Sequence, residues 1–389
     1  MRILISSTEG LGHIQPMLPL ALKLRERGHS VLWATADPGR ARIAAEGIGT
    51  VAAGWSQAAR HAEYQRRWPE SASLDVEAFV AQGFARSFGA VGAPAMFGDL
   101  LPVATTFQPD VIVADAAELA APIVARALRA PLVTHGYGLV VPPERVQGAV
   151  DQTEHLWATI GQAAPPFGGC YDDLYIDIYP RSMQPENLAY VGRIQSLRPT
   201  SMTRITGEVA SARVRAAIAD GRPLIYLTFG TLFNVNDTFR AAVEAFGSLS
   251  DVVVVVTVGP AGDVDAFGRQ PSHVTVERYV DQGEVLDHAS VVVSHGGSGT
   301  MLGALAEGIP QLMLPQAADQ LRNARACVRA GAATALFRDD ATVDAIRAAV
   351  VTAQTDVRMR VAAERLQAEI AAMPTVDDAA LAVERLGAP

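Results

Sequence analysis

Residues 291–320 constrain the fold of this chain more than any other stretch. They read VVVSHGGSGTMLGALAEGIPQLMLPQAADQ. A β-branched run ends in a glycine-rich turn, an Ala- and Leu-rich segment follows, and a second apolar run leads into a polar loop. This pattern predicts a strand, a turn, a helix, a second strand and a loop, which is the crossover unit of a parallel sheet. The sequence therefore predicts an α/β fold.

The glycine-rich turn at 294–300 (SHGGSGT) is a candidate phosphate site. A turn that opens a helix presents bare backbone N–H groups and the positive end of the helix dipole at one point, which suits an anion. Gly230 and Thr231, which directly follow another expected strand, offer an N–H and a hydroxyl to the same group. The turn itself offers an imidazole, hydroxyls and amides from His295, Gly297, Ser298, Gly299 and Thr300.

The polar loop at 315–320 (PQAADQ) should lie beside this turn. Such loops gather at the carboxyl ends of the strands in a parallel sheet. Asp319 and Gln320 supply one carboxylate and one amide, a natural pair for neighbouring sugar hydroxyls. The alternative is that Asp319 caps the helix expected at 321–329.

Composition narrows the class of protein. A chain of 389 residues is too long for one ordinary core, so we expect two domains. The net charge of −9 argues against general binding to nucleic acid or to anionic membranes. The two cysteines, Cys170 and Cys327, form neither a disulfide framework nor a metal-ligand spacing. The chain opens with a strand pattern and no charged and apolar leader, so we expect a cytoplasmic protein without stable membrane insertion.

Each half of the chain carries the pattern of a parallel α/β domain. The first half opens with a strand at 3–6, a helix at 16–27 and a strand at 30–34, and a new strand at 224–227 restarts the pattern. Region 52–101 is less regular. Periodicity falls off between the halves, where proline, serine and threonine gather. We predict one domain at 1–200, a linker at 201–222 and a second domain at 223–389.

His13 stands where the first strand passes into the first helix. The surrounding 10–15 (GLGHIQ) is similar to a dinucleotide-binding turn, but Gln15 replaces the third glycine and no acidic residue closes the second strand. An imidazole at this position can act as a general base near neutral pH. The alternative is a histidine at a helix N-terminus that bonds a local carbonyl.

Asp115 follows the apolar run 111–114 and should reach the same sheet edge as His13. A carboxylate bonded to one imidazole nitrogen fixes the tautomer and stabilises the imidazolium. Asp115 can also cap the next helix, and the two roles are compatible. The aspartate pairs at 172–173 and 339–340 have no strand end or nearby histidine, so they predict solvated loops and not a metal site. No serine or cysteine stands in a nucleophile-elbow pattern.

Together these residues resemble the family 1 nucleotide-sugar glycosyltransferases of the GT-B fold, and most of all the bacterial natural-product enzymes. The likeness is carried by Gly12 and His13 with Pro16, and by the more specific segments 294–300 and 315–320. It spans nearly the whole chain. The resemblance implies two Rossmann-like β/α/β domains that face each other across a cleft, with a C-terminal helix that returns to the N-terminal domain.

The resemblance also implies an inverting mechanism without a metal or another cofactor. His13 would deprotonate an acceptor hydroxyl, with Asp115 as its partner, while the oxygen attacks the anomeric carbon of the donor sugar. Donor binding would fall to Gly12, Gly230, Thr231, Tyr279, Val280, His295, Gly297, Ser298, Gly299, Thr300, Asp319 and Gln320.

Two departures from the family pattern concern the nucleotide. The family's W-x-P-Q motif reads YVDQ at 279–282, so Tyr279 stands where a tryptophan stacks on the base. Many relatives that use UDP-sugars place a glutamate on the ribose hydroxyls, where this chain has Gly303. A carboxylate there would have no partner in a deoxyribose, so we expect a dTDP-sugar, in particular a deoxysugar. A UDP-sugar is the alternative, since Glu307 lies one turn further on.

The acceptor is expected to be an apolar small molecule such as a polyketide or macrolide aglycone. Aromatic residues gather in 55–97 and 137–167, which predicts an apolar acceptor pocket, although core packing explains any one of them equally well. Three other functions stay open: carbon-linked glycosyl transfer to an aromatic polyketide, a nucleotide-sugar epimerase, and a non-catalytic helper protein. The intact His13 and Asp115 argue against the helper. A homodimer and a monomer are both compatible with the sequence.

Overall fold

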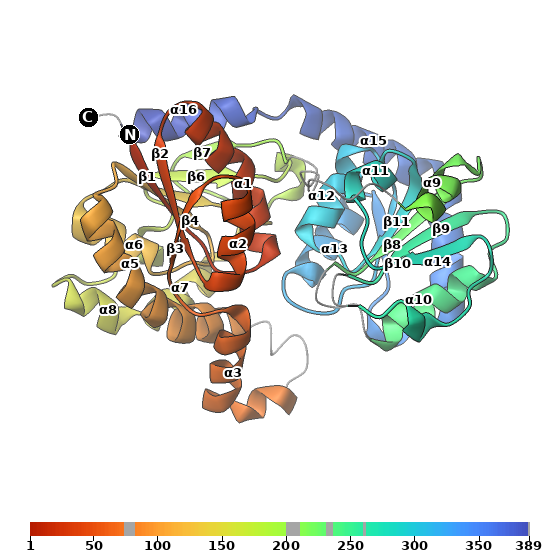
Figure 1. Ribbon diagram of the computed structural model, residues 1–389, viewed down its shortest axis with the longest axis horizontal. Helices are drawn as coiled ribbons and strands as arrows, with labels where there is room; N and C mark the ends of the chain where they lie inside the picture. Colours follow the sequence, from red (N-terminus) through yellow and green to blue (C-terminus); the bar gives the residue numbers. More distant parts are fainter. Residues whose placement is uncertain (74–81, 200–210, 231–235, 260–261, 388–389) are drawn as a thin grey trace. The chain divides into compact units, whose positions relative to one another are not determined.

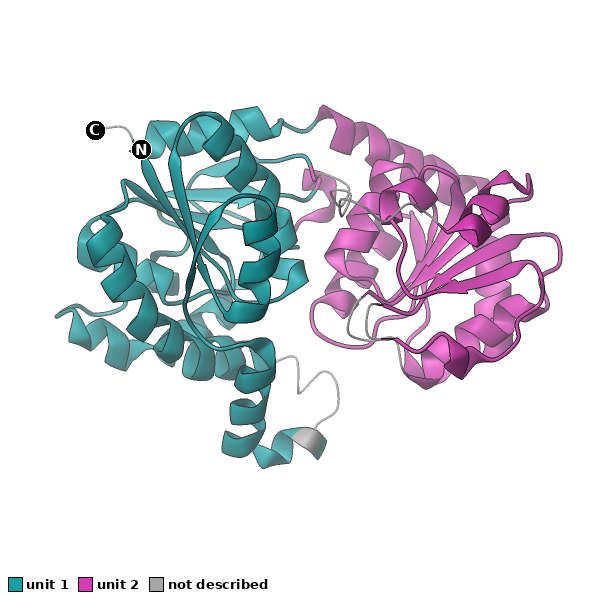
Figure 2. Cartoon of the chain, viewed as in Figure 1, with its two compact units in different colours: residues 1–179, 185–198, 373–389 teal, residues 180–184, 199–372 magenta. Residues whose placement is uncertain are grey.

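The computed structural model describes residues 1–73, 82–199, 211–230, 236–259 and 262–387. The chain divides into two compact units (Figure 2). Unit 1 comprises residues 1–179, 185–198 and 373–389, and unit 2 comprises residues 180–184 and 199–372.

The predicted linker is described only in part. Residues 201–210 lie outside the described residues, and helix α9 (Ala212–Ala219) occupies most of the remainder. The Ser211 hydroxyl caps this helix by accepting a hydrogen bond from the Val214 N–H.

Unit 1 is built on a parallel sheet, as the sequence predicts. Among the described residues the sheet has seven strands in the order β3-β2-β1-β4-β5-β6-β7 (Figure 1). The strands are β1 (Arg2–Ser6), β2 (Ser30–Thr35), β3 (Gly49–Ala52), β4 (Val111–Asp115), β5 (Leu132–His135), β6 (Leu174–Asp177) and β7 (Ile194–Ser196). The order reverses direction at β1, which pairs with both β2 and β4. Ligands of such sheets bind at the carboxyl ends of the strands beside this reversal.

Region 52–101 of unit 1 is more regular than the sequence predicts. That region is helical over most of its described part, and one segment, η2 (Ala85–Gly92), is a π-helix. The α-helices of the unit are α1 (Leu11–Glu26), α2 (Asp37–Ala45), α3 (Gln57–Arg67), α5 (Ala93–Phe107), α6 (Ala121–Leu128), α7 (Pro143–Asp151), α8 (Glu154–Thr159) and α16 (Val376–Gly387), with short 3₁₀ turns η1 (Pro69–Ser73) and η3 (Pro166–Gly169). The stretch Gln82–Phe107 is the one described helix that is long and apolar enough to cross a membrane on length and composition, with a mean hydropathy of 1.2.

Unit 2 repeats the architecture. Its described sheet has six parallel strands in the order β10-β9-β8-β11-β12-β13, and the reversal lies at β8. The strands are β8 (Leu224–Thr228), β9 (Val253–Thr257), β10 (Val274–Glu277), β11 (Ala289–Ser294), β12 (Gln311–Met313) and β13 (Ala333–Ala335). Besides α9 the α-helices are α10 (Asp237–Gly247), α11 (Gln282–Leu286), α12 (Ser298–Ala306), α13 (Gln320–Arg329), α14 (Val343–Thr355) and α15 (Val357–Ala372), with 3₁₀ turns η4 (Arg181–Met183), η5 (Asp265–Phe267) and η6 (Arg338–Asp340). The crossover predicted at 291–320 is confirmed as β11, α12 and β12.

The valine run of β9 explains why this sheet is buried on both faces. Val254 and Val256 belong to one hydrophobic core, whereas Val253 and Val255 belong to another. Side chains alternate between the faces of a strand, so a run without polar residues needs apolar cover on both sides. Helices supply that cover in a parallel sheet, and α10 and α14 pack together in the first of these cores.

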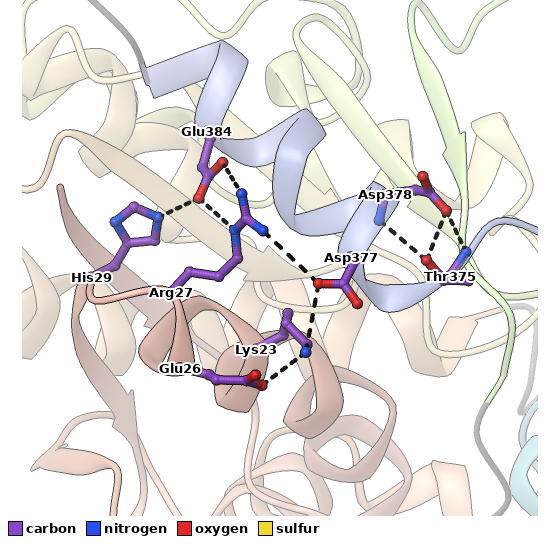
Figure 3. Close-up of polar contacts among 8 residues, drawn as sticks. All are labelled: Lys23, Glu26, Arg27, His29, Thr375, Asp377, Asp378 and Glu384. Atoms are coloured by element: carbon purple, nitrogen blue, oxygen red, sulfur yellow. Dashed lines mark hydrogen bonds and ion pairs between the residues drawn. The ribbon is translucent and has the colours of Figure 1, made fainter.

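The C-terminal helix α16 belongs to unit 1, which confirms that the chain returns to its first domain after α15. It packs against α1, and the contact carries a network of charged side chains (Figure 3). Arg27 donates two hydrogen bonds to the carboxylate of Glu384, at 2.7 and 2.9 Å. The His29 ring lies 2.7 Å from the same carboxylate. These hydrogen bonds from Arg27 and His29 lower the pKa of Glu384 to about 2.

Candidate active site

His13 and Asp115 meet at the strand reversal of unit 1. His13 is the third residue of α1, which follows β1, and Asp115 is the last residue of β4, the neighbour of β1. The Nδ1 atom of His13 lies 2.9 Å from Oδ2 of Asp115. The Asp115 side chain is 1% exposed, whereas that of His13 is 19% exposed. The pair therefore has a buried carboxylate and an imidazole that a small molecule can reach.

Asp115 also anchors the surrounding backbone. Its Oδ1 accepts a hydrogen bond from the Ala117 N–H at 3.1 Å, and its Oδ2 accepts one from the Thr8 hydroxyl at 3.0 Å. Asp115 therefore holds the turn that follows β4 and also contacts His13, but it does not cap the next helix, because α6 begins at Ala121 with Ala120 as its N-cap residue. Burial alone would raise the pKa of Asp115, but the facing His13 ring, the Ala117 N–H and the Thr8 hydroxyl keep that pKa below its usual value.

Two aromatic rings flank His13. The Tyr137 and Phe88 ring centroids lie 4.6 and 5.9 Å from the His13 ring centroid. They come from the two aromatic segments in which the sequence predicts an acceptor site, and both are partly exposed. Trp55 is 43% exposed, and Phe79 lies outside the described residues. Tyr137 and Phe88 thus place apolar ring surface beside the imidazole.

Glu118 is a buried carboxyl near this pair that the sequence reasoning missed. It is 3% exposed and accepts hydrogen bonds from the Ser6 hydroxyl at 2.7 Å and from the Ala120 and Ala121 N–H groups at 2.6 and 3.0 Å. Burial raises the pKa of Glu118 to about 7, and the nearby charge of Asp115 acts in the same direction. The signal in the sequence was a second acid, three residues after Asp115, inside the otherwise apolar run 111–125.

In unit 2, His295 follows β11 at the equivalent strand reversal. Its ring occupies the space beside two glycines, because a Cβ at Gly297 would lie 2.6 Å from Nε2 and a Cβ at Gly230 would lie 3.0 Å from Cε1. Gly230 also has a φ of +70°, a conformation that favours glycine. Burial lowers the pKa of His295 to about 4, against the opposing charge of Asp319, so the ring is neutral at pH 7. A side chain at Gly297 or Gly230 would therefore crowd the His295 imidazole, which accounts for glycine at both positions.

The N-terminus of α12 lies directly after this histidine. Gly297 is the N-cap residue, and no side chain among the described residues caps the helix. Gly299 in the first turn is exposed. The Thr300 hydroxyl donates to the side-chain oxygen of Gln282 at 3.2 Å, so it ties the turn to α11. The arrangement fits the predicted phosphate site, because the first N–H groups of a helix have no intrahelical acceptor.

Asn323 joins the turn to the polar loop, and sequence reasoning missed it as well. It is fully buried in α13, and its Nδ2 lies within hydrogen-bond distance of the Gly296 carbonyl at 2.9 Å, Oγ of Ser298 at 3.1 Å and Oδ2 of Asp319 at 3.0 Å. The Ser298 hydroxyl in turn donates to the same oxygen of Asp319 at 3.0 Å. Both of these contacts to Asp319 go to its Oδ2 atom.

The remaining predicted donor residues lie in different surroundings. The side-chain oxygen of Gln320 accepts from the N–H groups of Gln316 and Ala317 at 2.8 and 3.0 Å, which leaves its amide nitrogen as a donor for a ligand. Thr231 lies outside the described residues. Tyr279 is partly exposed, Val280 is buried, and Gly12 is exposed in the first turn of α1 in unit 1.

Gly303 lies in the middle of α12, against α11. A Cβ at this position would lie 3.1 Å from Cδ1 of Leu286 and 3.3 Å from Nε2 of Gln282. Glu307 is exposed at the C-cap, about 13 Å of helical rise from Ser298 at the other end of α12. It is therefore remote from the phosphate site.

Comparison with known proteins adds independent observations. Residues 242–386 match the family described as erythromycin biosynthesis protein CIII-like, C-terminal domain. The chain is 31% identical to the elloramycin glycosyltransferase ElmGT of Streptomyces olivaceus, over 88% of this chain and 87% of the relative. It is 28% identical to the 4'-demethylrebeccamycin synthase of Lentzea aerocolonigenes, over 99% of both chains. The chain is also similar to the crystal structure of the glycosyltransferase VinC in complex with dTDP. The alignment spans 100% of this chain and 99% of the VinC chain, with a TM-score of 0.79 and 24% sequence identity. This structural likeness confirms the predicted fold.

Proposed function

The chain belongs to the antibiotic glycosyltransferases of the GT-B fold, and on that premise we propose a specific reaction. It transfers a sugar from a nucleotide-sugar to a hydroxyl of an apolar natural-product acceptor, with inversion at the anomeric carbon. The contact between His13 and Asp115 carries this proposal. We assign acceptor activation to unit 1 and donor binding to unit 2.

His13 acts as the general base. With Nδ1 held by the buried Asp115, Nε2 is the nitrogen that removes the proton from the acceptor hydroxyl. The acceptor oxygen forms a bond to the anomeric carbon while the bond from that carbon to the diphosphate oxygen breaks. Asp115 stabilises the imidazolium that results, because its pKa below the usual range keeps it a carboxylate.

The α12 turn stabilises the departing diphosphate. Its helix N-terminus directs N–H groups and the positive end of the dipole at the anion. His295 is neutral at pH 7 and hydrogen-bonds the Thr228 backbone, so its imidazole shapes the turn and adds no full charge to it. Asp319 and Gln320 recognise hydroxyls of the donor sugar through a carboxylate oxygen and an amide nitrogen for which the described residues supply no hydrogen-bond partner.

The donor nucleotide is dTDP. Leu286 and Gln282 crowd the space beyond the Gly303 α-carbon, which supports a site without a carboxylate for a ribose 2′-hydroxyl. Glu307, the residue that could replace that carboxylate, lies at the far end of α12. The complex of VinC with dTDP supports the same nucleotide for a similar chain. Isothermal titration with dTDP and UDP tests the choice: tighter binding of dTDP is expected, and much tighter binding of UDP would overturn it.

Product analysis tests the reaction class. Mass spectrometry of mixtures that pair several nucleotide-sugars with polycyclic and macrolide aglycones should detect an acid-labile glycoside, and NMR of that product should show an inverted anomeric configuration. A carbon-linked product would resist acid, an epimerase would change the donor without an acceptor, and a helper protein would yield neither product. Cytoplasmic localisation stays a prediction from the sequence, and a homodimer stays one of the two oligomeric states that the sequence allows.

A further inference from the structure

Arg60 is a buried cation for which the proposed reaction has no role. It lies in α3 and is 8% exposed. Its guanidinium carbon lies 4.7 Å from the ring centroid of Phe88, so it stacks over that ring. Within the part of the chain that the structure describes, the guanidinium has neither a hydrogen-bond acceptor nor an ion-pair partner. None of its nitrogens is among the buried polar atoms that lack a partner, so the guanidinium reaches solvent and its five N–H donors are accessible to a ligand.

The nearest carboxylates are already engaged by other groups. Burial lowers the pKa of Arg60, and the charges of Asp115 and Glu9 oppose that shift. Asp115 faces His13, while Glu9 accepts a hydrogen bond from the Gln57 N–H at 2.6 Å. Neither carboxylate pairs directly with Arg60. Arg60 therefore has no contact partner among the described residues, and its N–H groups can bind a ligand from outside.

Arg60 also stands near the surface that an acceptor would occupy. Phe88 contacts Arg60 through its face and lies 5.9 Å from the His13 ring, so one aromatic residue separates the cation from the base. His13, Phe88 and Tyr137 are all partly exposed. A molecule whose hydroxyl reaches His13 would lay its rings against Phe88 and Tyr137 and bring its other substituents toward Arg60.

We propose that Arg60 binds an anionic oxygen of the acceptor, so that the acceptor is an aromatic molecule with a carboxylate or an ionised phenol in addition to the hydroxyl that receives the sugar. This inference rests on the proposed role of His13. A guanidinium matches such oxygens because its planar N–H groups form paired, charge-assisted hydrogen bonds. The flanking rings favour a flat aromatic partner over an aliphatic one.

Matched ligands separate this role from a purely structural one. Binding of 2-naphthoate is compared with binding of its neutral analogue 2-naphthamide, in the absence of a nucleotide-sugar. A second pair tests an ionised phenol: 4-nitrophenol, at a pH above its pKa, is compared with the neutral 4-nitroanisole. Each anion should bind about 10- to 100-fold more tightly than its neutral analogue, the size expected for charge-assisted hydrogen bonds. Preference for 2-naphthoate alone assigns a carboxylate, and preference for 4-nitrophenolate alone assigns a phenol. Equal binding within both pairs would overturn the proposal.

Substitutions of Arg60 test whether this residue causes the preference for anionic ligands. Arg60→Gln should abolish the preference by weakening only the anions, and Arg60→Lys should keep part of it. Arg66→Gln is the matched control, since Arg66 is an exposed residue of the same helix paired with Glu63. An equal loss for charged and neutral ligands in Arg60→Gln would show a packing role and contradict the proposal. If Arg60→Gln does not fold, the proposal is tested by the wild-type protein and Arg60→Lys. A preference for anions in the wild type that Arg60→Lys keeps in part supports it, and no preference in the wild type contradicts it.

The transfer reaction is read separately, with 6-hydroxy-2-naphthoate and 6-hydroxy-2-naphthamide as acceptors. A lower KM for the acid at similar kcat supports Arg60, and the same KM for both contradicts it. If neither acceptor is glycosylated while 2-naphthoate still binds through Arg60, the proposed reaction fails and the anion site stands.

Discussion

The Nδ1 atom of His13 lies 2.9 Å from Oδ2 of Asp115, at the point where the strand order of unit 1 reverses. Parallel strands bring their carboxyl ends to one edge, so a residue after β1 and a residue at the end of β4 meet although 102 positions separate them in the sequence. The meeting gives the imidazole one defined tautomer.

Asp115→Asn should lower kcat by about 10²- to 10⁴-fold, because an amide stabilises neither the required tautomer nor the imidazolium. The KM for the nucleotide-sugar should stay unchanged, since the predicted donor residues apart from Gly12 belong to unit 2. Thr8→Val is the control: it removes one hydrogen bond to Asp115 but keeps the carboxylate, and its loss should be smaller. Steady-state kinetics of both variants check the prediction, and a kcat near that of the wild type in Asp115→Asn would refute the partnership.

Gly297→Ala should weaken donor binding. The new Cβ would lie 2.6 Å from Nε2 of His295, so the ring must leave its position. Gly98→Ala is the matched control, because nothing lies within 4 Å of the corresponding Cβ in α5. That variant should bind dTDP normally and be slightly more stable, by about 0.5–1 kcal/mol. Titration calorimetry with dTDP compares the two, and equal affinities would contradict the proposed role of His295.

Asn323→Ala should raise the KM for the donor and lower stability. It leaves the buried Gly296 carbonyl without its side-chain donor and releases Asp319, at a cost of about 1–3 kcal/mol in the free energy of unfolding. The KM for the acceptor should not change. Asn187→Ala, which removes an exposed hydrogen bond to the Ala189 N–H, should change neither quantity appreciably. Urea unfolding and donor titrations measure the two effects, and a stable Asn323→Ala enzyme with a normal donor KM would rule the role out.

Glu118 should make the stability of the protein depend on pH. Folding raises its pKa from 4.5 to about 7, so its contribution is fully present below pH 4.5 and is lost as the pH rises through 7. The unfolding free energy of the wild type relative to Glu118→Gln should therefore fall over that interval. Urea denaturation at several pH values measures this difference, which cancels the titration of groups common to both proteins. A difference that is independent of pH would mean that Glu118 does not titrate in this range.

The placement of the candidate residues could be predicted because it follows from strand ends. His13, Asp115 and His295 each stand where an apolar run ends, and the rule that such ends share one edge is independent of detailed packing. Thr231 was predicted on the same basis but lies outside the described residues. Their chemical roles stay proposals, since a strand end fixes a position and not a reaction.

Other features depend on tertiary contacts that no local pattern reveals. Asparagine is a poor helix former, and nothing near Asn323 in the sequence explains its position in the middle of α13. Its structural role depends on the hydrogen bonds that it makes to Gly296 and Ser298. The region 52–101 contains glycines that argue against helix locally. Yet α5 includes Gly98, and also Pro102 just beyond that region, because its apolar face packs into the core of unit 1. A π-helix at 85–92 has no signature in the sequence that sets it apart from an α-helix.

The central claim is that His13 is the acceptor base of a glycosyltransferase, and one comparison tests it most directly. Wild-type protein and His13→Ala are incubated with a dTDP-sugar and a hydroxylated aromatic acceptor, glycoside formation is followed by mass spectrometry, and dTDP affinity is measured on the same samples. We expect turnover of His13→Ala to fall by about 10²- to 10⁴-fold while its affinity for dTDP stays that of the wild type. Near-normal turnover by His13→Ala would contradict the account.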